Sequence, residues 1–181
     1  MKSIAVFCAA SVGNQPLYLE TAHQVGLAIA QRGLTLVYGG SKIGLMGEVA
    51  RAALSVGGRV IGVLPHFLSS KEIALEGVKV IMVDTMHERK QKMCDLSDGF
   101  LTLPGGFGTL DEFFEMITWA QLQLKKAPNA LLNCNGYYDF LLQQMDKMTE
   151  EGLLLQKNYD LVLRDENIER LLDKMLAYSK R

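Results

Sequence analysis

The sequence predicts an α/β protein of the doubly wound, Rossmann-like class, with a parallel sheet and helices on both of its faces. Short apolar runs of strand length alternate with amphipathic stretches of helix length along the chain. The apolar runs lack strict polar alternation, as expected for strands buried on both faces. Such alternation of strands and helices is typical of parallel sheets with helical crossovers. We expect a single domain over residues 1–181, because a chain of this length can bury one sizeable core.

The strands are predicted from short runs rich in apolar and β-branched residues. The run that follows Met1 and Lys2 resembles a short signal peptide, but it is too short and continues directly into a loop and a helix. We therefore interpret it as the first strand. The predicted strands are Ser3–Cys8, Thr35–Tyr38, Arg59–Leu64, Val78–Val83, Phe100–Leu103, Ala130–Asn133 and a short last one at Leu161–Leu163.

The helices are predicted from amphipathic stretches and from residues that favour helix ends. Asn14 is expected to cap the first helix, Gly33 to end it, and Asp165 to cap the last one. Thr85 and Glu88 have the spacing of a capping box, which predicts a helix start between them. The predicted helices are Pro16–Arg32, Gly44–Val56, Met86–Leu96, Leu110–Leu124, Tyr137–Glu151 and Glu166–Ser179.

Composition excludes several classes of function. A hydrophobic content of 49% and a charged content of 22% predict a globular protein. A net charge of -1 argues against a nucleic-acid-binding protein, which normally needs a basic face. Cys8, Cys94 and Cys134 are widely spaced, so we expect free thiols and neither a metal site nor a disulfide framework. No segment is long enough to span a membrane, and we expect a cytoplasmic protein.

In doubly wound folds, ligands bind at the carboxyl ends of the strands. The functional residues are therefore expected in the loops at that edge. These loops are Ala9–Asn14, Gly39–Gly44, Pro65–Glu76, Asp84–Arg89 and Pro104–Thr109.

The most informative loop is the glycine-rich stretch from Pro104 to Thr109. It joins the apolar run Phe100–Leu103 to a predicted helix. Backbone N–H groups at such a turn carry the positive end of the helix dipole, which makes an anion site. Glycines let the backbone approach a phosphate where a Cβ would clash. We predict a phosphate-binding turn here.

Glu112 lies three residues after Thr109, beside the predicted phosphate. The spacing of these two residues also fits a capping box, and that alone would be a purely structural role. The adjacent glycines favour a functional role instead, because a capping glutamate does not need them. We predict that Glu112 acts on a group attached to the phosphate.

Two further stretches are candidates for the same site. The cluster from Gly39 to Gly47 joins the second strand to a helix, and it forms either a tight packing turn or the floor for a ribose or a base. Its spacing is not that of a dinucleotide-binding motif. The helix start at Thr85 places Arg89 either on a solvated basic face or towards the pocket. Arginine suits the second role, because its planar donors hold carboxylates and phosphates bidentately.

The helix after the glycine turn is apolar on more than one face. Such a helix packs against more than one surface, which is either internal or a second subunit. We favour a homodimer. The apolar residues are Phe113, Phe114, Met116, Ile117, Trp119, Ala120, Leu122 and Leu124.

Three ordered motifs make the chain resemble the LOG ("Lonely Guy") family. They are Gly39-Gly40-x-x-x-Gly44-Leu45-Met46-Gly47, then Met86-His87-x-Arg89-Lys90, then Pro104-Gly105-Gly106-x-Gly108-Thr109-x-x-Glu112. The resemblance runs from Ile4 to about Leu154. Members are cytokinin riboside 5′-monophosphate phosphoribohydrolases, although similar sequences have often been labelled lysine decarboxylases. We find no motif for a pyridoxal phosphate Schiff base that would support the second label.

The resemblance implies hydrolysis of the N-glycosidic bond of a purine nucleoside 5′-monophosphate, to free base and ribose 5-phosphate. It implies no metal and no organic cofactor, and a homodimer with its site near the interface. By motif position, Arg89 and Glu112 are the implied catalytic pair. The implied phosphate contacts are Gly105, Gly106, Gly108 and Thr109, and the residues that face the sugar or base are Gly40, Gly44 and Met46. The further implied substrate contacts are Glu72, Lys90, Phe107, Leu110, Asp111 and Thr118.

The expected mechanism passes through a sugar with oxocarbenium character, which the carboxylate of Glu112 stabilises while it orients or deprotonates water. Arg89 is expected to keep Glu112 ionised, because an adjacent cation lowers the pKa of a carboxyl group. Two alternatives stay open. One is a non-catalytic carrier or sensor of a nucleotide-like ligand, similar to molybdenum-cofactor carriers, and the other is transfer of the ribosyl group to an acceptor other than water.

Overall fold

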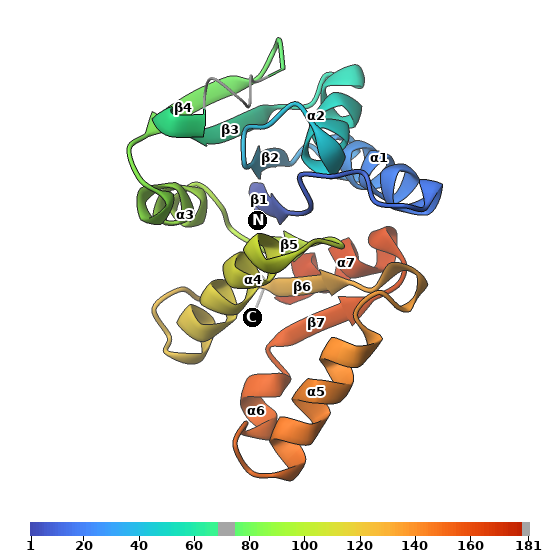
Figure 1. The fold of residues 1–181 in the computed structure, drawn as a ribbon, viewed down its shortest axis with the longest axis vertical. Helices are drawn as coiled ribbons and strands as arrows, with labels where there is room; N and C mark the ends of the chain where they lie inside the picture. Colours follow the sequence, from blue (N-terminus) through green and yellow to red (C-terminus); the bar gives the residue numbers. More distant parts are fainter. Residues whose placement is uncertain (69–74, 179–181) are drawn as a thin grey trace.

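The computed structural model describes residues 1–68 and 75–178. Its strands form one sheet of seven in the order β4-β3-β2-β1-β5-β6-β7, and every neighbouring pair is parallel. The chain runs outward from β1 to β4 and then returns to place β5 beside β1 (Figure 1). The strands are β1 (Ser3–Phe7), β2 (Thr35–Tyr38), β3 (Val60–Pro65), β4 (Lys79–Val83), β5 (Phe100–Thr102), β6 (Asn129–Leu132) and β7 (Val162–Asp165).

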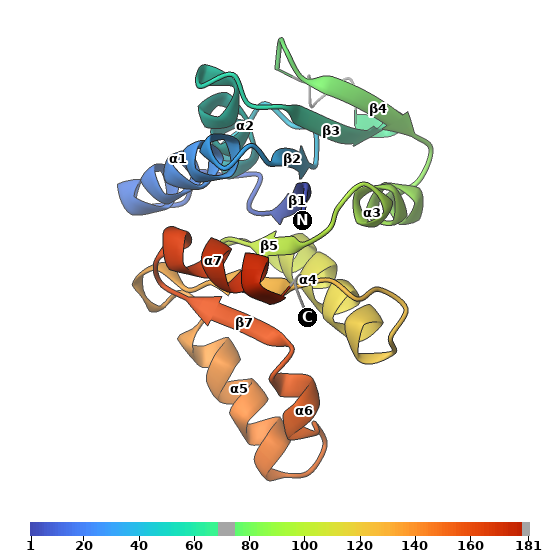
Figure 2. The same ribbon diagram turned by 180° about the vertical axis from the view of Figure 1, so that it is seen from behind.

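Helices cover both faces of the sheet, as Figures 1 and 2 show from opposite sides. Helices α1, α2 and α7 pack on one face, and α3, α4 and α5 pack on the other. The doubly wound, Rossmann-like class predicted from the sequence is thus confirmed. The helices are α1 (Pro16–Gln31), α2 (Gly44–Ser55), α3 (Met86–Asp95), α4 (Phe107–Gln121), α5 (Asp139–Glu150), α6 (Gln156–Tyr159) and α7 (Ile168–Tyr178), with single 3₁₀ turns η1 (His66–Leu68) and η2 (Cys134–Gly136).

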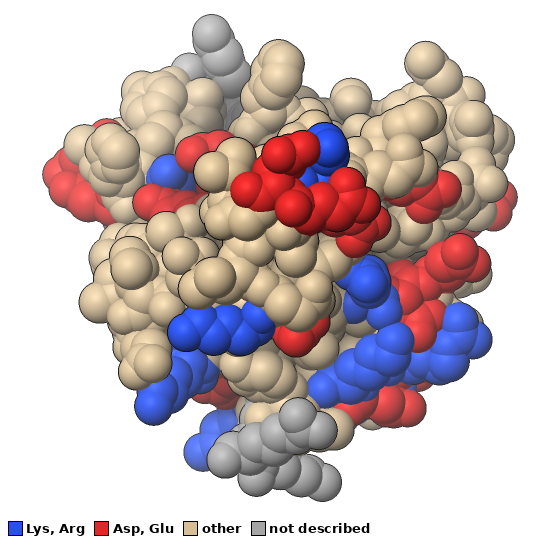
Figure 3. All heavy atoms as spheres, turned by 90° about the horizontal axis from the view of Figure 1, so that it is seen from below, with Lys and Arg blue, Asp and Glu red and all other residues tan. Residues whose placement is uncertain are grey.

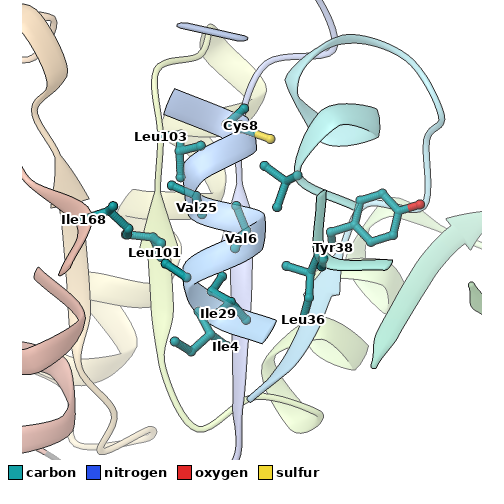
Figure 4. Packing of buried hydrophobic residues seen from close by; sticks show 14 of the residues in the cluster. Ile4, Val6, Cys8, Val25, Ile29, Leu36, Tyr38, Leu101, Leu103 and Ile168 are labelled. Carbon is teal, nitrogen blue, oxygen red and sulfur yellow. The ribbon is translucent and has the colours of Figure 1, made fainter. Parts of the chain in front are cut away.

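The core follows from the two-residue period of the central strand. Ile4 and Val6 of β1 face α1 and α7, whereas Ala5 and Phe7 face α3 and α4. Figure 4 shows the first of these clusters, with Val25 of α1 lying over the strand. Both faces of β1 are therefore buried, which explains why its sequence shows no polar alternation.

Two of the predicted helix caps are wrong. No side-chain bond caps α1, which begins at Pro16 after Gln15, so Asn14 does not have this role. The cap of α7 is Asn167, whose Oδ1 accepts a hydrogen bond from the N–H of Arg170 at 3.1 Å. Asp165 ends β7 instead, and its carboxylate binds the guanidinium of Arg170. Residue preference alone could not separate these neighbouring polar residues.

Two other predicted helix ends are confirmed. Gly33 follows the end of α1 with a φ of +70°, a conformation that favours glycine. Thr85 caps α3, and its Oγ1 accepts a hydrogen bond from the N–H of Glu88 at 3.1 Å. The second arm of the box is shifted by one residue, because the carboxylate of Glu88 accepts from the N–H of Asp84 at 2.8 Å.

The surface in Figure 3 carries charges of both signs. Lysine and arginine side chains lie among aspartate and glutamate side chains on this face, in keeping with the formal net charge of -1. It is not the uniformly basic kind of face that neutralises nucleic-acid phosphates. Within the described part of the chain, none of the helices has the length and apolar character needed to cross a lipid bilayer.

Candidate active site

The candidate site lies where the strand order reverses, at the carboxyl ends of β1 and β5. A cavity of about 500 Å³ opens there, and its walls include the chain from Cys8 to Ser11, Arg89 of α3, and Thr109 and Glu112 of α4. A larger hollow of about 990 Å³ lies at the opposite edge of the sheet, beside Lys2. Neither the glycine turn nor the pair of Arg89 and Glu112 borders that hollow, so the chemistry belongs to the smaller cavity.

The glycine turn opens α4 three residues earlier than predicted. The helix begins at Phe107 and its N-cap is Gly106, so Thr109 and Glu112 both lie inside it. A capping box between these two residues is therefore wrong. The first N–H groups of the helix have no intrahelical partner, and they belong to residues beside the cavity, including Gly108. This arrangement is the one that binds anions at a helix N-terminus.

Neighbouring residues hold the glycine turn in place. The hydroxyl of Tyr137 donates to the carbonyl of Gly105 at 2.8 Å, and the hydroxyl of Tyr138 donates to the carbonyl of Leu103 at 2.6 Å. A Cβ on Gly105 would overlap the side chain of Thr109, so glycine is needed at that position. Gly106 and Gly108 have open space where a Cβ would stand, and they are exposed. The turn is thus anchored on its inner side and open on its outer side.

Arg89 is buried in the pocket wall, with 8% of its surface exposed. Its Nε donates to the carbonyl of Val63 at 3.2 Å, and its Nη2 donates to the carbonyl of Gly39 at 3.1 Å. Its Nη1 lies 3.5 Å from Oε1 of Glu112. The alternative of a solvated basic face is therefore wrong for this side chain, and the structure brings the two implied catalytic residues together.

Glu112 has an unusual protonation behaviour, because it is only 9% exposed. Burial raises the pKa of its carboxyl group from the ordinary 4.5 to about 7. Arg89 and Lys90 lower this pKa, and Asp111 and Glu115 raise it, but burial is the largest effect. The expectation that Arg89 keeps the pKa of Glu112 low is thus wrong in its net direction. A carboxyl group whose pKa is near 7 can both accept and donate a proton at neutral pH.

Lys90 binds two carboxylates of α4. Its Nζ lies 3.1 Å from Oδ2 of Asp111 and 3.0 Å from Oε2 of Glu115. Its side chain is 11% exposed. These two pairs tie α3 to α4 next to the pair of Arg89 and Glu112. Lys90 does not border the cavity, whereas Asp111 does.

The other predicted site residues differ in where they lie. Met46 borders the cavity, but Thr118 does not, and it is exposed on α4. Leu110 is partly buried against the core between α4 and α5. Phe107 is 95% exposed beside the turn. Glu72 lies outside the described residues.

Two glycines of the second cluster have structural reasons to be glycine. Gly44 has a φ of +62°, and a Cβ on it would overlap the backbone of Ala10. Gly40 has a φ of +84°, and its Cβ would lie 3.1 Å from the Cβ of Leu64. Both glycines are therefore needed for close packing. Neither of them borders the cavity, and their role as the floor for a sugar or a base stays a prediction.

Several cavity residues have no motif of their own in the sequence. Cys8, Ala10 and Ser11 form the wall at the end of β1, and Leu68 and Met86 also line the cavity. The sequence predicts that the loop after the first strand contributes to the site, but nothing in its composition indicates which of its residues border the cavity. Burial raises the pKa of the Cys8 thiol well above its ordinary value, so this wall is neutral.

Replacement of Glu112 by glutamine should stabilise the protein at alkaline pH relative to the wild type. The folded-state pKa of about 7 is above the unfolded value, so the carboxyl group favours folding below pH 4.5, and this contribution is lost as the pH rises through 7. Glutamine does not titrate. The free energy of unfolding of Glu112→Gln relative to the wild type, measured with urea, should be higher at pH 8 than at pH 5 by up to about 3 kcal/mol. A difference that is the same at both pH values would contradict the raised pKa.

Comparison with known proteins gives relatives over almost the whole chain. A family model described as "Possible lysine decarboxylase" matches residues 46–175. The chain is 42% identical over 181 residues to a cytokinin riboside 5′-monophosphate phosphoribohydrolase, LOG1, of Arabidopsis thaliana, and this match covers 99% of the chain and 85% of the relative. A probable enzyme of the same name from that plant, LOG6, is 44% identical over 98% of the chain and 89% of its own length.

Solved structures share the fold at lower identity. The molybdenum cofactor binding protein of Rippkaea orientalis has a TM-score of 0.71 and 24% identity, over 98% of the chain and 97% of its own. The molybdenum cofactor carrier protein of Chlamydomonas reinhardtii has a TM-score of 0.71 and 21% identity, with 99% of each chain covered. At this level of identity the likeness concerns the fold alone.

Proposed function

Since the chain belongs to the LOG family, whose relatives it matches at 42% identity and above, we propose that it hydrolyses the N-glycosidic bond of purine nucleoside 5′-monophosphates. The products are the free base and ribose 5-phosphate. The single observation that carries this proposal is the buried pair of Arg89 and Glu112, 3.5 Å apart in a cavity whose wall includes a helix N-terminus. A carrier needs the anion site but not the carboxylate.

In the proposed reaction, the bond between C1′ of the ribose and the nitrogen of the base breaks, and its electron pair leaves with the base. Positive charge develops on the sugar, as in glycoside hydrolysis. The carboxylate of Glu112 stabilises this charge and takes a proton from the water that adds to C1′. Its pKa of about 7 allows this proton to be released again at neutral pH, and the departing base takes up one proton at the nitrogen that carried the sugar.

Arg89 is proposed to position Glu112 and to touch the substrate. Its guanidinium is held by two backbone carbonyls, so its orientation is fixed before any ligand binds. The N-terminus of α4 is proposed to hold the phosphate, with Gly106, Gly108 and Thr109 beside it. Binding energy from the phosphate then positions the sugar over the carboxylate.

Decarboxylation of lysine has no support in the residues of this cavity. None of the described residues that line it is a lysine, so none of these residues could form a Schiff base. The ammonium group of the nearby Lys90 binds Asp111 and Glu115 instead. We therefore prefer the activity in the names of the curated relatives.

The scope of the enzyme is tested with two substrates. Purified protein is incubated with AMP and with isopentenyladenosine 5′-monophosphate, and the free base is followed by chromatography. We expect release from both, since the proposed chemistry acts at the ribose. Release from the prenylated nucleotide alone would restrict the proposal to cytokinin nucleotides. Tight binding without any release would favour a carrier.

We also propose a homodimer with the site near its interface. Phe107 and Phe114 lie on one stripe of α4 with Asp111 and Thr118, and they are 95% and 37% exposed. A second copy that covered this stripe would bury both phenyl rings and would lie beside the glycine turn. Light scattering coupled to size exclusion should give twice the mass of 20.1 kDa, and a monomer at micromolar concentration would contradict the proposal.

A further inference from the structure

We propose that Gly39 is a positioning residue, and that the lack of a side chain there seats the guanidinium of Arg89 against Glu112. The inference rests on the proposed function, and it assigns a role to the first glycine of the second cluster. Gly39 directly follows β2. It does not border the cavity, so its effect on the reaction would pass through Arg89.

The seat of Arg89 is built from three parts of the chain. The carbonyl of Gly39 accepts from Nη2 at 3.1 Å, and the carbonyl of Val63 in β3 accepts from Nε at 3.2 Å. Nη1 is left to face Glu112 of α4 at 3.5 Å. Because the guanidinium is planar and rigid, fixing two of its edges determines where the third points.

A side chain at position 39 would take the place of this guanidinium. A Cβ built on Gly39 overlaps Nη2 of Arg89, and it lies 3.1 Å from Cζ of Arg89 and 2.8 Å from the sulfur of Met46. All of these atoms belong to side chains and none to the backbone. The fold can therefore absorb an added methyl group, but only if Arg89 leaves its seat and the flexible side chain of Met46 shifts.

The backbone itself does not require glycine at this position. Gly40, the next residue, has a φ of +84°, whereas the φ of Gly39 is outside the left-handed region. The φ of Gly39 is thus in the range that alanine also adopts. The proximity of Arg89 and Met46 is the reason for glycine here, which makes Gly39→Ala an informative test.

The test is a double-mutant cycle with Gly39→Ala and Arg89→Ala, measured as base released from isopentenyladenosine 5′-monophosphate. We expect Gly39→Ala to lower kcat/KM by about 100-fold, since a misplacement of about 1 Å in a catalytic group costs that much. In the Arg89→Ala background the same change should cost less than about twofold, because the guanidinium is absent and the sulfur of Met46 belongs to a flexible side chain that can shift. Equal losses in both backgrounds, or no loss in either, would overturn the proposal.

Gly99→Ala is the matched control. An added Cβ there lies 2.8 Å from the sulfur of Met1, and its three nearest atoms all belong to side chains. Its backbone also lies outside the left-handed region. This variant should keep wild-type activity and show what an added methyl group costs away from Arg89. If Gly39→Ala fails to fold, a folded Gly39→Ala/Arg89→Ala double variant supports the proposal, and an unfolded one overturns it.

A second readout separates this proposal from the proposed function. The ¹³C signal of the Glu112 carboxyl carbon is titrated in the wild type and in Gly39→Ala. Displacement of the guanidinium should raise the pKa of Glu112 further, even in a protein that releases no base, and an unchanged pKa would overturn the proposal. The charged and titratable groups that face Glu112 are Arg89, Lys90, Asp111, Glu115 and Cys8, and only Arg89 is displaced by the added methyl group.

Discussion

Replacement of Glu112 by glutamine is expected to lower kcat by at least about 10³-fold, while the protein stays folded. Glutamine has nearly the same shape and can still accept a hydrogen bond, but it carries no charge to stabilise the sugar cation and takes no proton from water. Each of these two effects contributes about 10²-fold or more in enzymes. The measurement is single-turnover release of base from isopentenyladenosine 5′-monophosphate at pH 8, where the wild-type carboxyl group is ionised.

The control for this variant is Glu150→Gln. Glu150 ends α5 and its side chain is 69% exposed, so the same chemical change there should leave the rate unaltered. Circular dichroism would confirm that both variants keep their helices. A wild-type rate in Glu112→Gln would remove Glu112 from the mechanism and return it to a role in packing.

Removal of the 5′-phosphate from the substrate is expected to lower kcat/KM by about 10³-fold or more. Charge-assisted hydrogen bonds contribute about 1.5–3 kcal/mol each, so the loss of two of them from the turn accounts for this factor. The loss should appear in kcat as well as in KM, because the phosphate positions the sugar over Glu112. The measurement compares isopentenyladenosine with its 5′-monophosphate under identical conditions.

Product inhibition gives an independent control for the phosphate site. Ribose 5-phosphate should compete with the substrate, whereas ribose should not. Equal turnover of the nucleoside and the nucleotide would show that the N-terminus of α4 does not anchor a phosphate. The open turn at Gly106 and Gly108 would then need another explanation.

Much of the fold followed from the sequence, because the pattern of apolar runs reflects burial directly. Ile4 and Ala5 belong to opposite cores on the two faces of β1, and so the strand had to be apolar throughout. The sequence does not predict the short helix α6, Gln156–Tyr159, because four residues are too few to show a helical period. The start of α4 was placed too late, because glycines at 106 and 108 were assigned to the loop.

The candidate site could be predicted in part. The motifs pointed to Arg89 and Glu112, and the topology of the sheet explains why residues 23 positions apart in sequence can meet at one edge. The net direction of the Glu112 pKa shift could not be predicted. It depends on how burial compares with the attraction of Arg89, and this balance is a property of the folded molecule. The contact between Gly39 and Arg89 could not be predicted either, because it depends on how the chain packs in the folded molecule.

The most direct test of the central claim is the stoichiometry of products from one substrate. Wild-type protein is incubated with isopentenyladenosine 5′-monophosphate, and free base and ribose 5-phosphate are quantified together in the same samples. If Arg89 and Glu112 catalyse hydrolysis, the free base and ribose 5-phosphate should appear in a ratio of one to one. Neither of the two products should appear with Glu112→Gln. Free base without ribose 5-phosphate would indicate transfer of the ribosyl group to another acceptor. If neither product appeared, the result would contradict an N-glycosidase activity altogether.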